Sequence, residues 1–232
     1  MLRLSIIIPA LDEATGIAAT LAALAPFRER GSEVIVVDGG SRDETVERAR
    51  ALADRVLSAP RGRASQMNAG AAVAAGDVLL FLHADTTLPD EADGLLLYGI
   101  ADTGRAWGYF DIAIEGRNPL LRVVSSLMNW RSQITGIATG DQAMFVTREA
   151  FVQAGGFPDI PLMEDIALSK ALKRIGLPLC LAVHVRTSGR RWIENGAVRT
   201  ILQMWRLRFD YWRGAEPAAL ARRYGYLPRD RA

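Results

Sequence analysis

Carboxylate residues follow three short apolar runs, and this recurrence is the feature of the sequence that most directly suggests chemistry. Residues 4–8 lead to Glu13, residues 34–37 stop at Asp38, and residues 78–82 lead to Asp85. Short β-branched runs of this kind are typical of buried strands in a mostly parallel sheet. The ligand crevice of an open α/β sheet lies at the carboxyl ends of its strands. Three carboxylates there would repel a bare diphosphate, but they suit a base, a ribose and a divalent cation, so the pattern indicates a nucleotide and metal site.

Helical patterns alternate with these runs and would position the carboxylates. We expect helices over 13–25, closed by Pro26, over 41–52, begun by a capping box of Ser41 and Glu44, and over 63–75. A further short strand is expected near Val56. This rhythm predicts a doubly wound nucleotide-binding half over residues 1–88.

The remaining sequence is less regular, as expected for a half that binds a particular substrate. It predicts helices over 89–100, 119–133 and 163–176, a helical turn over 148–155, and strands over 106–114 and 140–146. No internal repeat or low-complexity tract is visible. Half of the 232 residues are hydrophobic, so a packed core is expected.

Three features of the sequence bear on the cellular compartment. Cys180, the single cysteine, lies in an apolar run and is expected to be a buried small hydrophobe in a reducing compartment. The sequence shows no signal-peptide layout and no apolar run of roughly 18 residues that could span a membrane. These features predict a cytoplasmic protein.

The C-terminal part is basic and contains a strong helix pattern over 195–214. From Arg186 onward the chain has 11 arginines and 4 acidic residues, a net charge of +7 against +2 for the whole chain. Arg199, Arg206 and Arg213 fall seven residues apart beside a broad apolar face that includes Trp205. We favour packing of this face on the rest of the protein; the alternative is peripheral contact with the inner face of a membrane. Nothing resembles a nucleic-acid-binding module.

Four segments, in this order and spacing, resemble family 2 glycosyltransferases: SIIIPALDE, EVIVVDGGSRDET, LLFLHADT and MEDIALSKAL. The third motif places the chain near small bacterial members in which HAD replaces the usual D-x-D. The resemblance implies an α/β fold of the GT-A type, a single domain with a mixed, mostly parallel central sheet and helices on both faces. The resemblance covers residues ~3–195. The expected domain spans 1–195, divided into 1–88 for the nucleotide and 89–195 for acceptor and catalysis, followed by a C-terminal helix and basic tail over 196–232.

The resemblance assigns the first two motifs to the nucleotide. Pro9, Ala10 and Leu11 would bring backbone groups close to it, Glu13 would accept ribose hydroxyl groups, and Asp38 would accept an N–H from a uracil-like or guanine base. The donor is therefore expected to be a UDP- or GDP-sugar. Glu13 could instead complement a helix dipole. At the start of the third helix, Arg63 is placed to reach a phosphate, while Asn68 and Gly70 could serve either the nucleotide or packing.

The third motif is expected to bind Mg²⁺ or Mn²⁺. Asp85 is the predicted ligand, with the remaining positions filled by diphosphate and water oxygens. His83 replaces the first acid and would orient the ribose or a water; a core role is the alternative. His184 could be a distal ligand, although its apolar strand favours a buried imidazole.

The last motifs carry the predicted catalytic chemistry. Asp165 matches the family base, because inversion needs a group that deprotonates the acceptor hydroxyl as it attacks opposite the leaving diphosphate. Glu164 would orient it or share its proton. The donor sugar and acceptor are expected to contact the remaining matched positions, with one of the two arginines on the diphosphate: Gly140, Asp141, Gln142, Arg190, Arg191 and Trp192.

The predicted function is therefore an inverting, metal-dependent transfer of a sugar from a nucleotide-diphosphate donor to a hydroxyl acceptor. A nucleotidyltransferase of related fold would need a Gly-rich, basic loop after the first strand, which PALDEATG does not supply. A non-catalytic nucleotide-sugar-binding protein would have no need of both Asp85 and Asp165. The sequence favours a soluble acceptor slightly over a lipid-linked one.

Overall fold

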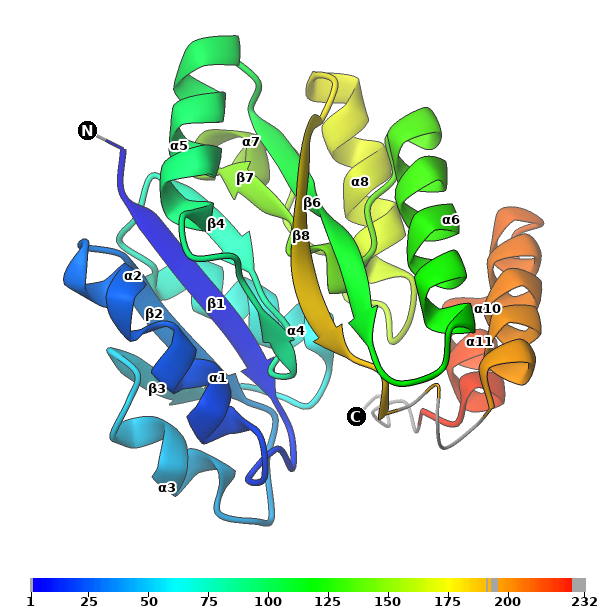
Figure 1. The fold of residues 1–232 in the computed structure, drawn as a ribbon, viewed down its shortest axis with the longest axis horizontal. Coiled ribbons are helices and arrows are strands. Elements are labelled where there is room, and N and C mark those ends of the chain that lie inside the picture. Colours follow the sequence, from blue (N-terminus) through cyan, green and yellow to red (C-terminus); the bar gives the residue numbers. More distant parts are fainter. Residues whose placement is uncertain (1, 191, 193–195, 227–232) are drawn as a thin grey trace.

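The fold is built on a mixed sheet whose parallel half carries the first three motifs (Figure 1). The computed structural model describes residues 2–190, 192 and 196–226. Within them the eight strands run in the order β3-β2-β1-β4-β7-β6-β8-β5. Their bounds are β1 (Leu4–Ala10), β2 (Glu33–Asp38), β3 (Arg55–Ser58), β4 (Val78–Phe81), β5 (Thr86–Thr87), β6 (Trp107–Glu115), β7 (Phe145–Thr147) and β8 (Leu179–Ser188). Strand β7 is antiparallel to both its neighbours and β5 is antiparallel to β8, whereas the other pairs are parallel.

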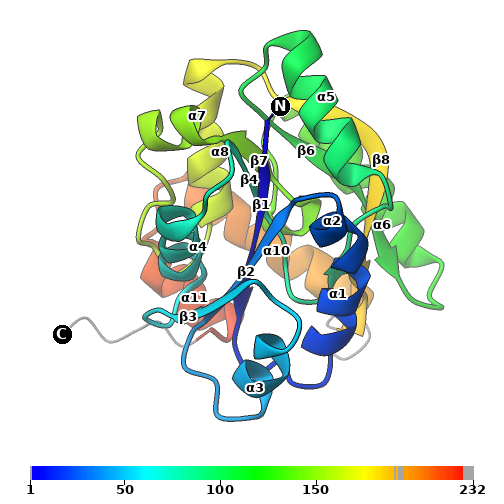
Figure 2. The ribbon, with the colours of Figure 1, turned by 90° about the vertical axis from the view of Figure 1, so that its left-hand side faces the viewer.

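Helices cover both faces of this sheet (Figure 2). Those on one face are α1 (Ile17–Ala23), α2 (Ala25–Glu29), α5 (Ala92–Thr103) and α6 (Leu120–Thr135). Those on the other face are α4 (Arg63–Val73), α7 (Arg148–Gln153) and α8 (Glu164–Ile175). The remaining elements are α3 (Thr45–Arg50), the 3₁₀ turn η1 (Gly140–Gln142), α10 (Ala197–Trp212) and α11 (Pro217–Tyr224). The expected mixed sheet with helices on both faces is confirmed.

Alternation along the central strands separates two hydrophobic cores. In β2, Val34 and Val36 belong to the core under α1, α5 and α6, whereas Ile35 and Val37 belong to the core under α4 and α8. Successive side chains of a strand point to opposite faces of the sheet, and helices cover both faces here, so all four of these residues are buried. The apolar runs of the sequence are continuous for this reason.

Helix α4 approaches the sheet closely at Gly70. A Cβ atom at this position would lie 2.4 Å from Ile7 Cγ2 and 3.0 Å from Val37 Cγ2. Asn68, on the same helix, exchanges hydrogen bonds with the backbone of Phe157 at 2.8 and 3.0 Å. Of the two interpretations left open for Asn68 and Gly70, the geometry supports packing.

Two local predictions in the first half are wrong. Pro26 does not close the first helix; it lies in the first turn of α2, where a missing N–H costs nothing. The predicted capping box does not form, since α3 begins at Thr45 with Glu44 at its N-cap and no side-chain cap bond. The Ser41 hydroxyl instead accepts a hydrogen bond from the Asp12 N–H.

The C-terminal helices attach to the start of α8 through a small third core. Its members include Met163 and Ile166 around α8, Leu207 of α10 and Leu220 of α11. Helix α10 therefore uses a narrow face for packing, while much of its broad apolar face is exposed, with Trp205 64% exposed. The prediction that the broad face is buried is wrong for this reason. Among the described residues, none of the helices has the length and apolar character needed to cross a membrane.

Candidate functional site

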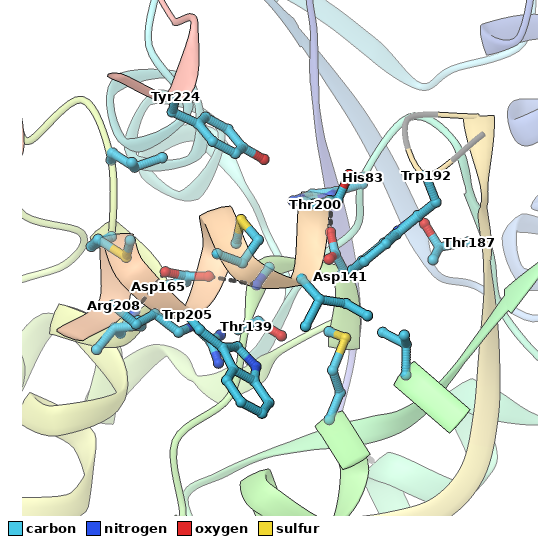
Figure 3. Close-up of a pocket in the computed structure, with 18 of the residues that line it drawn as sticks. His83, Thr139, Asp141, Asp165, Thr187, Trp192, Thr200, Trp205, Arg208 and Tyr224 are labelled. Carbon is cyan, nitrogen blue, oxygen red and sulfur yellow. Dashed lines mark hydrogen bonds and ion pairs between the residues drawn. The ribbon is translucent and has the colours of Figure 1, made fainter. Parts of the chain in front are cut away.

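One large cavity collects residues from both halves of the chain (Figure 3). Its volume is about 1070 Å³. Its lining comes from the loop after β1, the segment after β4, the end of β8 and the helices α4, α6, α8, α10 and α11. Nine of the predicted site residues line it: Glu13, Arg63, His83, Asp85, Gly140, Asp141, Asp165, Arg190 and Trp192. The cavity thus lies where the first, third and last sequence motifs meet.

The loops after β1 and β2 are joined by side chains at the edge of the cavity. Beside the Ser41 bond, the Glu13 N–H donates to Thr45 Oγ1 at 2.8 Å, and the Arg42 N–H donates to Asp12 Oδ1 at 2.8 Å. Asp12 adopts a left-handed φ of 54°, which an Asp tolerates better than most residues. These bonds hold Glu13 at the cavity wall and explain why hydroxyl and acidic residues follow the second strand.

Asp38 and the predicted backbone contacts of the first motif lie behind this edge. Asp38 is buried, and its carboxylate accepts hydrogen bonds from the N–H groups of Gly40 and Ser41. The Ala10 carbonyl accepts the Gln66 side-chain amide, which also donates to the Val37 carbonyl. Neither Asp38 nor any of residues 9–11 lines the large cavity; Pro9 and Ala10 are buried and Leu11 is half-buried.

Glu13, Asp85 and Arg190 make a charged rim. Burial raises the pKa of Glu13. The charge of Arg190 lowers this pKa, whereas the charge of Asp85 raises it further. The Glu13–Arg190 ion pair is loose, with Nη2 and Oε2 3.8 Å apart. Asp85 is exposed, and its carboxylate makes no hydrogen bond or ion pair with any described residue. The rim therefore has one free carboxylate and one weakly held guanidinium.

These donors suit a hard cation only in part. Within the described residues, no group of three or more His, Cys, Asp or Glu side chains is arranged to hold a metal ion. The free Asp85 carboxylate is an oxygen ligand of the kind that Mg²⁺ and Mn²⁺ prefer, and Mg²⁺ commonly uses one or two carboxylates with substrate phosphates and water. The residues therefore fit a cation that binds together with a diphosphate.

His83 is held by Asp141 and by the close backbone of Gly140. His83 Nδ1 lies 3.1 Å from Asp141 Oδ1. Burial alone would lower the pKa of His83, but the hydrogen bond and charge of Asp141 outweigh it and raise the pKa. A Cβ atom on Gly140 would lie 2.6 Å from His83 Nε2, so the ring needs a glycine there. His83 therefore faces the cavity from a fixed position and is not a residue of the apolar core.

Asp165 lies at the start of α8, with both carboxylate oxygens held by backbone N–H groups. Oδ2 accepts from Gly140 at 2.8 Å and Oδ1 accepts from Ile166 at 2.7 Å. Met163, the N-cap residue of α8, has a left-handed φ of 70° that directs the chain into the helix. Such strain in a non-glycine residue is common at functional sites. The result is a carboxylate that faces the cavity in a fixed orientation.

Glu164 does not line the cavity and pairs with Arg63, which does. Glu164 Oε1 lies 2.9 Å from Arg63 Nε, and the Glu164 side chain is only 3% exposed. Burial raises the pKa of Glu164 while Arg63 opposes this, and the Glu164 charge raises the pKa of Arg63. The neighbouring carboxylates of the Glu-Asp motif thus have separate positions: one anchors Arg63 at the cavity wall and the other faces the cavity.

Some predicted contacts are not in the cavity. Gln142 is fully buried, and its side chain bonds Ser132, the Thr139 backbone and the Phe110 carbonyl, so it holds the η1 turn and does not line the pocket. His184 is exposed on β8, so the prediction of a buried imidazole is wrong, and it does not line the cavity either. Arg191 lies outside the described residues.

Sequence reasoning missed the α6 and α10 side of the cavity. Arg131 and Trp130 contribute from α6, whereas Trp205 and Arg208 contribute from α10. The helical pattern drew attention to Arg199 and its partners, which are exposed and outside the cavity. Arg208 could have been noticed as a basic residue within the apolar part of the helix.

Comparison with known proteins relates this arrangement to sugar transfer. A family model described as "Glycosyl transferase family 2" matches residues 5–151. The curated protein "Probable glycosyltransferase YdaM" of Bacillus subtilis (strain 168) is 26% identical over 198 residues, which are 75% of this chain and 47% of that protein. The chain thus spans about half the length of this relative.

Solved structures share the fold. The crystal structure of residues 1–349 of S. aureus TarS in complex with UDP-GlcNAc has a TM-score of 0.65 at 19% identity, covering 80% of this chain and 58% of that one. The mannosyltransferase PcManGT from Pyrobaculum calidifontis, in complex with GDP-Man and Mn²⁺, has a TM-score of 0.63 at 22% identity, covering 80% and 56%. The fold of the present chain is therefore that of GT-A glycosyltransferases.

Proposed function

This chain belongs to glycosyl transferase family 2, and from that premise we propose that it transfers a sugar from a nucleotide-diphosphate donor to a hydroxyl acceptor, with inversion and with a divalent cation. The single observation that carries the proposal is the shared cavity. It brings the free carboxylate of Asp85, at the end of the parallel strands, to the same space as the oriented carboxylate of Asp165 on α8. The Asp85 carboxylate is suited to bind the cation of a nucleotide-sugar donor, and the Asp165 carboxylate is suited to take the proton of an acceptor hydroxyl.

Asp165 is the proposed base. An inverting transfer needs one group that takes the proton of the acceptor hydroxyl while that oxygen attacks the anomeric carbon and the bond to the diphosphate breaks. Backbone N–H groups orient the Asp165 carboxylate before the acceptor arrives, and each oxygen has lone pairs left for the acceptor proton. Since Glu164 is tied to Arg63, it is not a second base.

The donor diphosphate is proposed to lie between Arg63, Arg190 and Asp85. Arg63 is fixed by Glu164, and Arg190 is held only weakly by Glu13, so it is available for an anion. Both can stabilise the charge that develops on the leaving diphosphate. Asp85 would hold a bound Mg²⁺ or Mn²⁺, which would supply further positive charge to the phosphate oxygens. TarS and PcManGT have UDP-GlcNAc and GDP-Man in their structures, which supports a UDP- or GDP-sugar as the donor here.

A panel of nucleotide sugars tests this function. The purified protein is incubated with each UDP- or GDP-sugar and Mn²⁺, and release of the nucleoside diphosphate is measured with and without a cell extract as acceptor source. We expect extract-dependent release with one donor, abolished by a chelator. A non-catalytic sugar-nucleotide-binding protein would bind a donor without release under any of these conditions, and that outcome would reject the enzyme.

We further propose that the protein contacts an anionic membrane surface through a face made by α6 and α10, which lie side by side (Figure 1). Large apolar residues recur every three or four positions on each helix and are 42–75% exposed. This apolar α6–α10 face consists of Leu120, Val123, Leu127, Trp130 and Ile134 with Val198, Leu202, Trp205, Phe209 and Trp212. Exposed apolar surface of this extent marks an interaction site.

Charge indicates which partner covers this face. Arg122 on α6 and Arg199, Arg206 and Arg213 on α10 are exposed on the same two helices. Tryptophan at headgroup depth and arginine toward lipid phosphate are typical of interfacial helices. The cavity opens on this face, because Trp130 and Trp205 line it.

Vesicle flotation tests the membrane contact. We expect the protein to float with phosphatidylglycerol-containing vesicles at physiological salt, and Leu202→Glu with Trp212→Glu to abolish flotation. Tyr98→Glu, on α5 and 71% exposed, is the matched control and should float as the original does. Failure of the unchanged protein to float would reject the proposal.

A further inference from the structure

Two half-buried arginines that line the cavity each have a buried polar atom without a partner. Arg131 of α6 and Arg208 of α10 both line the cavity, and the Nε atom of each is buried without a hydrogen-bond partner. Arg131 donates to the adjacent Ser132 hydroxyl, whereas Arg208 donates no hydrogen bond to any described residue. Unsatisfied buried polar groups are rare in folded proteins and call for an explanation.

The two guanidinium groups also repel each other. Burial, followed by the charge of Arg208, lowers the pKa of Arg131 to about 10, and burial lowers the pKa of Arg208. A guanidinium group keeps its proton at neutral pH, so both side chains carry a positive charge. Asp165 and Asp141 exert a favourable charge on each arginine, but none of these pairs is close enough to form an ion pair. Figure 3 shows Arg208 beside Asp165, at the opposite end of the view from His83.

Charged neighbours distinguish this pair from the arginines of the proposed donor site. Arg190 pairs with Glu13, whose pKa also responds to the charge of Asp85, and the Arg63 charge is already paired with Glu164 of α8. The carboxylates that act on Arg131 and Arg208 are instead Asp165 and Asp141. Asp165 lies within electrostatic range of the pair. A group bound by the pair would therefore belong to the molecule whose hydroxyl Asp165 deprotonates.

We propose that Arg131 and Arg208 bind a phosphate group carried by the acceptor. A phosphate fits this site because guanidinium groups bind its oxygens with paired, charge-assisted hydrogen bonds, and two arginines match its charge. The inference rests on the proposed transfer reaction, since it names the chemical class of that reaction's acceptor: a hydroxyl compound with a phosphate near the hydroxyl. The compound is either water-soluble or a lipid whose tail lies on the apolar α6–α10 face.

The alternative is that the arginines serve only as counter-charges for Asp165 and Asp141. The two interpretations predict opposite effects on stability. If the pair is kept for a ligand, Arg131→Gln and Arg208→Gln each remove a buried, repelled charge, and the melting temperature without ligand is unchanged or rises. If the pair is structural, each variant leaves a carboxylate uncompensated and the melting temperature falls.

Binding is measured with two pairs of probes that differ only in a phosphate. Glycerol phosphate and glycerol represent a soluble acceptor; lysophosphatidic acid and monoolein, in detergent micelles, represent a lipid. Titrations follow the fluorescence of the cavity tryptophans, which include Trp130 and Trp205. We expect at least one phosphate probe to bind, its uncharged partner to bind at least about tenfold more weakly, and Arg131→Gln or Arg208→Gln each to weaken binding about tenfold or more.

Controls separate this site from the donor site. Arg174→Gln, exposed on α8 and outside the cavity, should bind the probe as the original protein does. Arg208→Lys keeps the charge but not the paired hydrogen bonds, so it should weaken binding less than Arg208→Gln does. UDP and GDP binding with Mn²⁺ is measured in every variant and should not change. If the unchanged protein binds neither UDP nor GDP, the proposed transfer reaction is rejected. The phosphate titration still tests whether the two arginines form a phosphate site.

Three binding results would overturn the inference. They are the absence of binding by either phosphate probe, equal binding of a phosphate probe and its uncharged partner, and unchanged binding by the Arg131→Gln, Arg208→Gln double variant. A fall in melting temperature of either single variant below that of Arg174→Gln would assign the pair to structure and would also overturn it. Binding by glycerol phosphate indicates a soluble acceptor, and binding by lysophosphatidic acid alone indicates a lipid acceptor; both support the site.

Discussion

Asp165 owes its orientation to two backbone N–H groups, those of Gly140 and Ile166. An asparagine can accept only one of these two bonds, because its amide nitrogen is a donor. For Asp165→Asn we expect kcat to fall by ~10²–10⁴, the usual contribution of a positioned base, with the donor KM nearly unchanged. The lost bond should reduce stability by about 1 kcal/mol. Steady-state kinetics and thermal unfolding measure both; turnover within a few-fold of the original would remove Asp165 from the mechanism.

Asp85 is a free carboxylate at the rim, so its proposed role depends on an added cation and diphosphate. We expect Asp85→Ala to weaken UDP or GDP binding in the presence of Mn²⁺ and to leave the weak metal-free binding unchanged. Removing the carboxylate should not affect folding, since it has no hydrogen bond to lose. Calorimetric titration with and without chelator measures the difference. Equal Mn²⁺-dependent affinity in both proteins would mean that Asp85 is not a ligand.

Residue types and order indicated much of the candidate site. Residues that end or follow a strand, such as Glu13 and Asp85, reach the cavity because parallel strands deliver their ends to one edge. The predictions failed where a polar side chain points into the protein interior. Gln142 is an example, because its amide bonds backbone groups around η1 and the sequence does not show the direction of a side chain. Arg131 and Arg208 were missed because their meeting depends on how two distant helices pack.

At the scale of elements, buried strands were the most predictable part and helix starts the least. The run 34–37 lies within β2, since a doubly covered strand must be apolar throughout. The start of α3 was misplaced because the Ser41 hydroxyl bonds the loop after β1, a partner 29 residues away that local capping rules cannot anticipate. The residues before α3 therefore hold the loop at the edge of the cavity and do not cap the helix.

Contact between α4 and the sheet gives a prediction at this scale. A valine at Gly70 would clash with Ile7 and Val37, so α4 would have to move from strands that carry the nucleotide-binding loops. We expect Gly70→Val to cost at least about 1–3 kcal/mol, the usual cost of overpacking, and to lower Tm by several degrees. Ala72→Val, on the exposed side of the same helix, is the control for helix propensity. Equal Tm values for the two variants would show that the approach at Gly70 is not tight.

For the molecule as a whole, the sequence predicted the order of parts but not how the C-terminal helices join them. Helix α10 was expected to pack by its broad apolar face on the rest of the protein or to contact a membrane. It contributes Thr200 and Arg208 to the cavity and exposes Trp205 and Trp212 beside α6. Hydrophobicity alone cannot distinguish an apolar face that packs from one that meets a partner. The cavity is therefore formed by residues within the matched range 5–151 together with residues of α8, α10 and α11 that follow it.

The stereochemistry of transfer tests the central claim most directly, namely that one base in this cavity drives a single displacement. The protein is supplied with the active nucleotide sugar and its acceptor, and the anomeric configuration of the new glycosidic bond is read by NMR coupling constants. One displacement opposite the leaving diphosphate predicts that an α-linked donor gives a β-linked product, and that Asp165→Asn gives almost none. An α-linked product from the same donor would contradict the account, because retention requires either two displacements or attack on the same face as the leaving diphosphate, and neither is a single displacement opposite it.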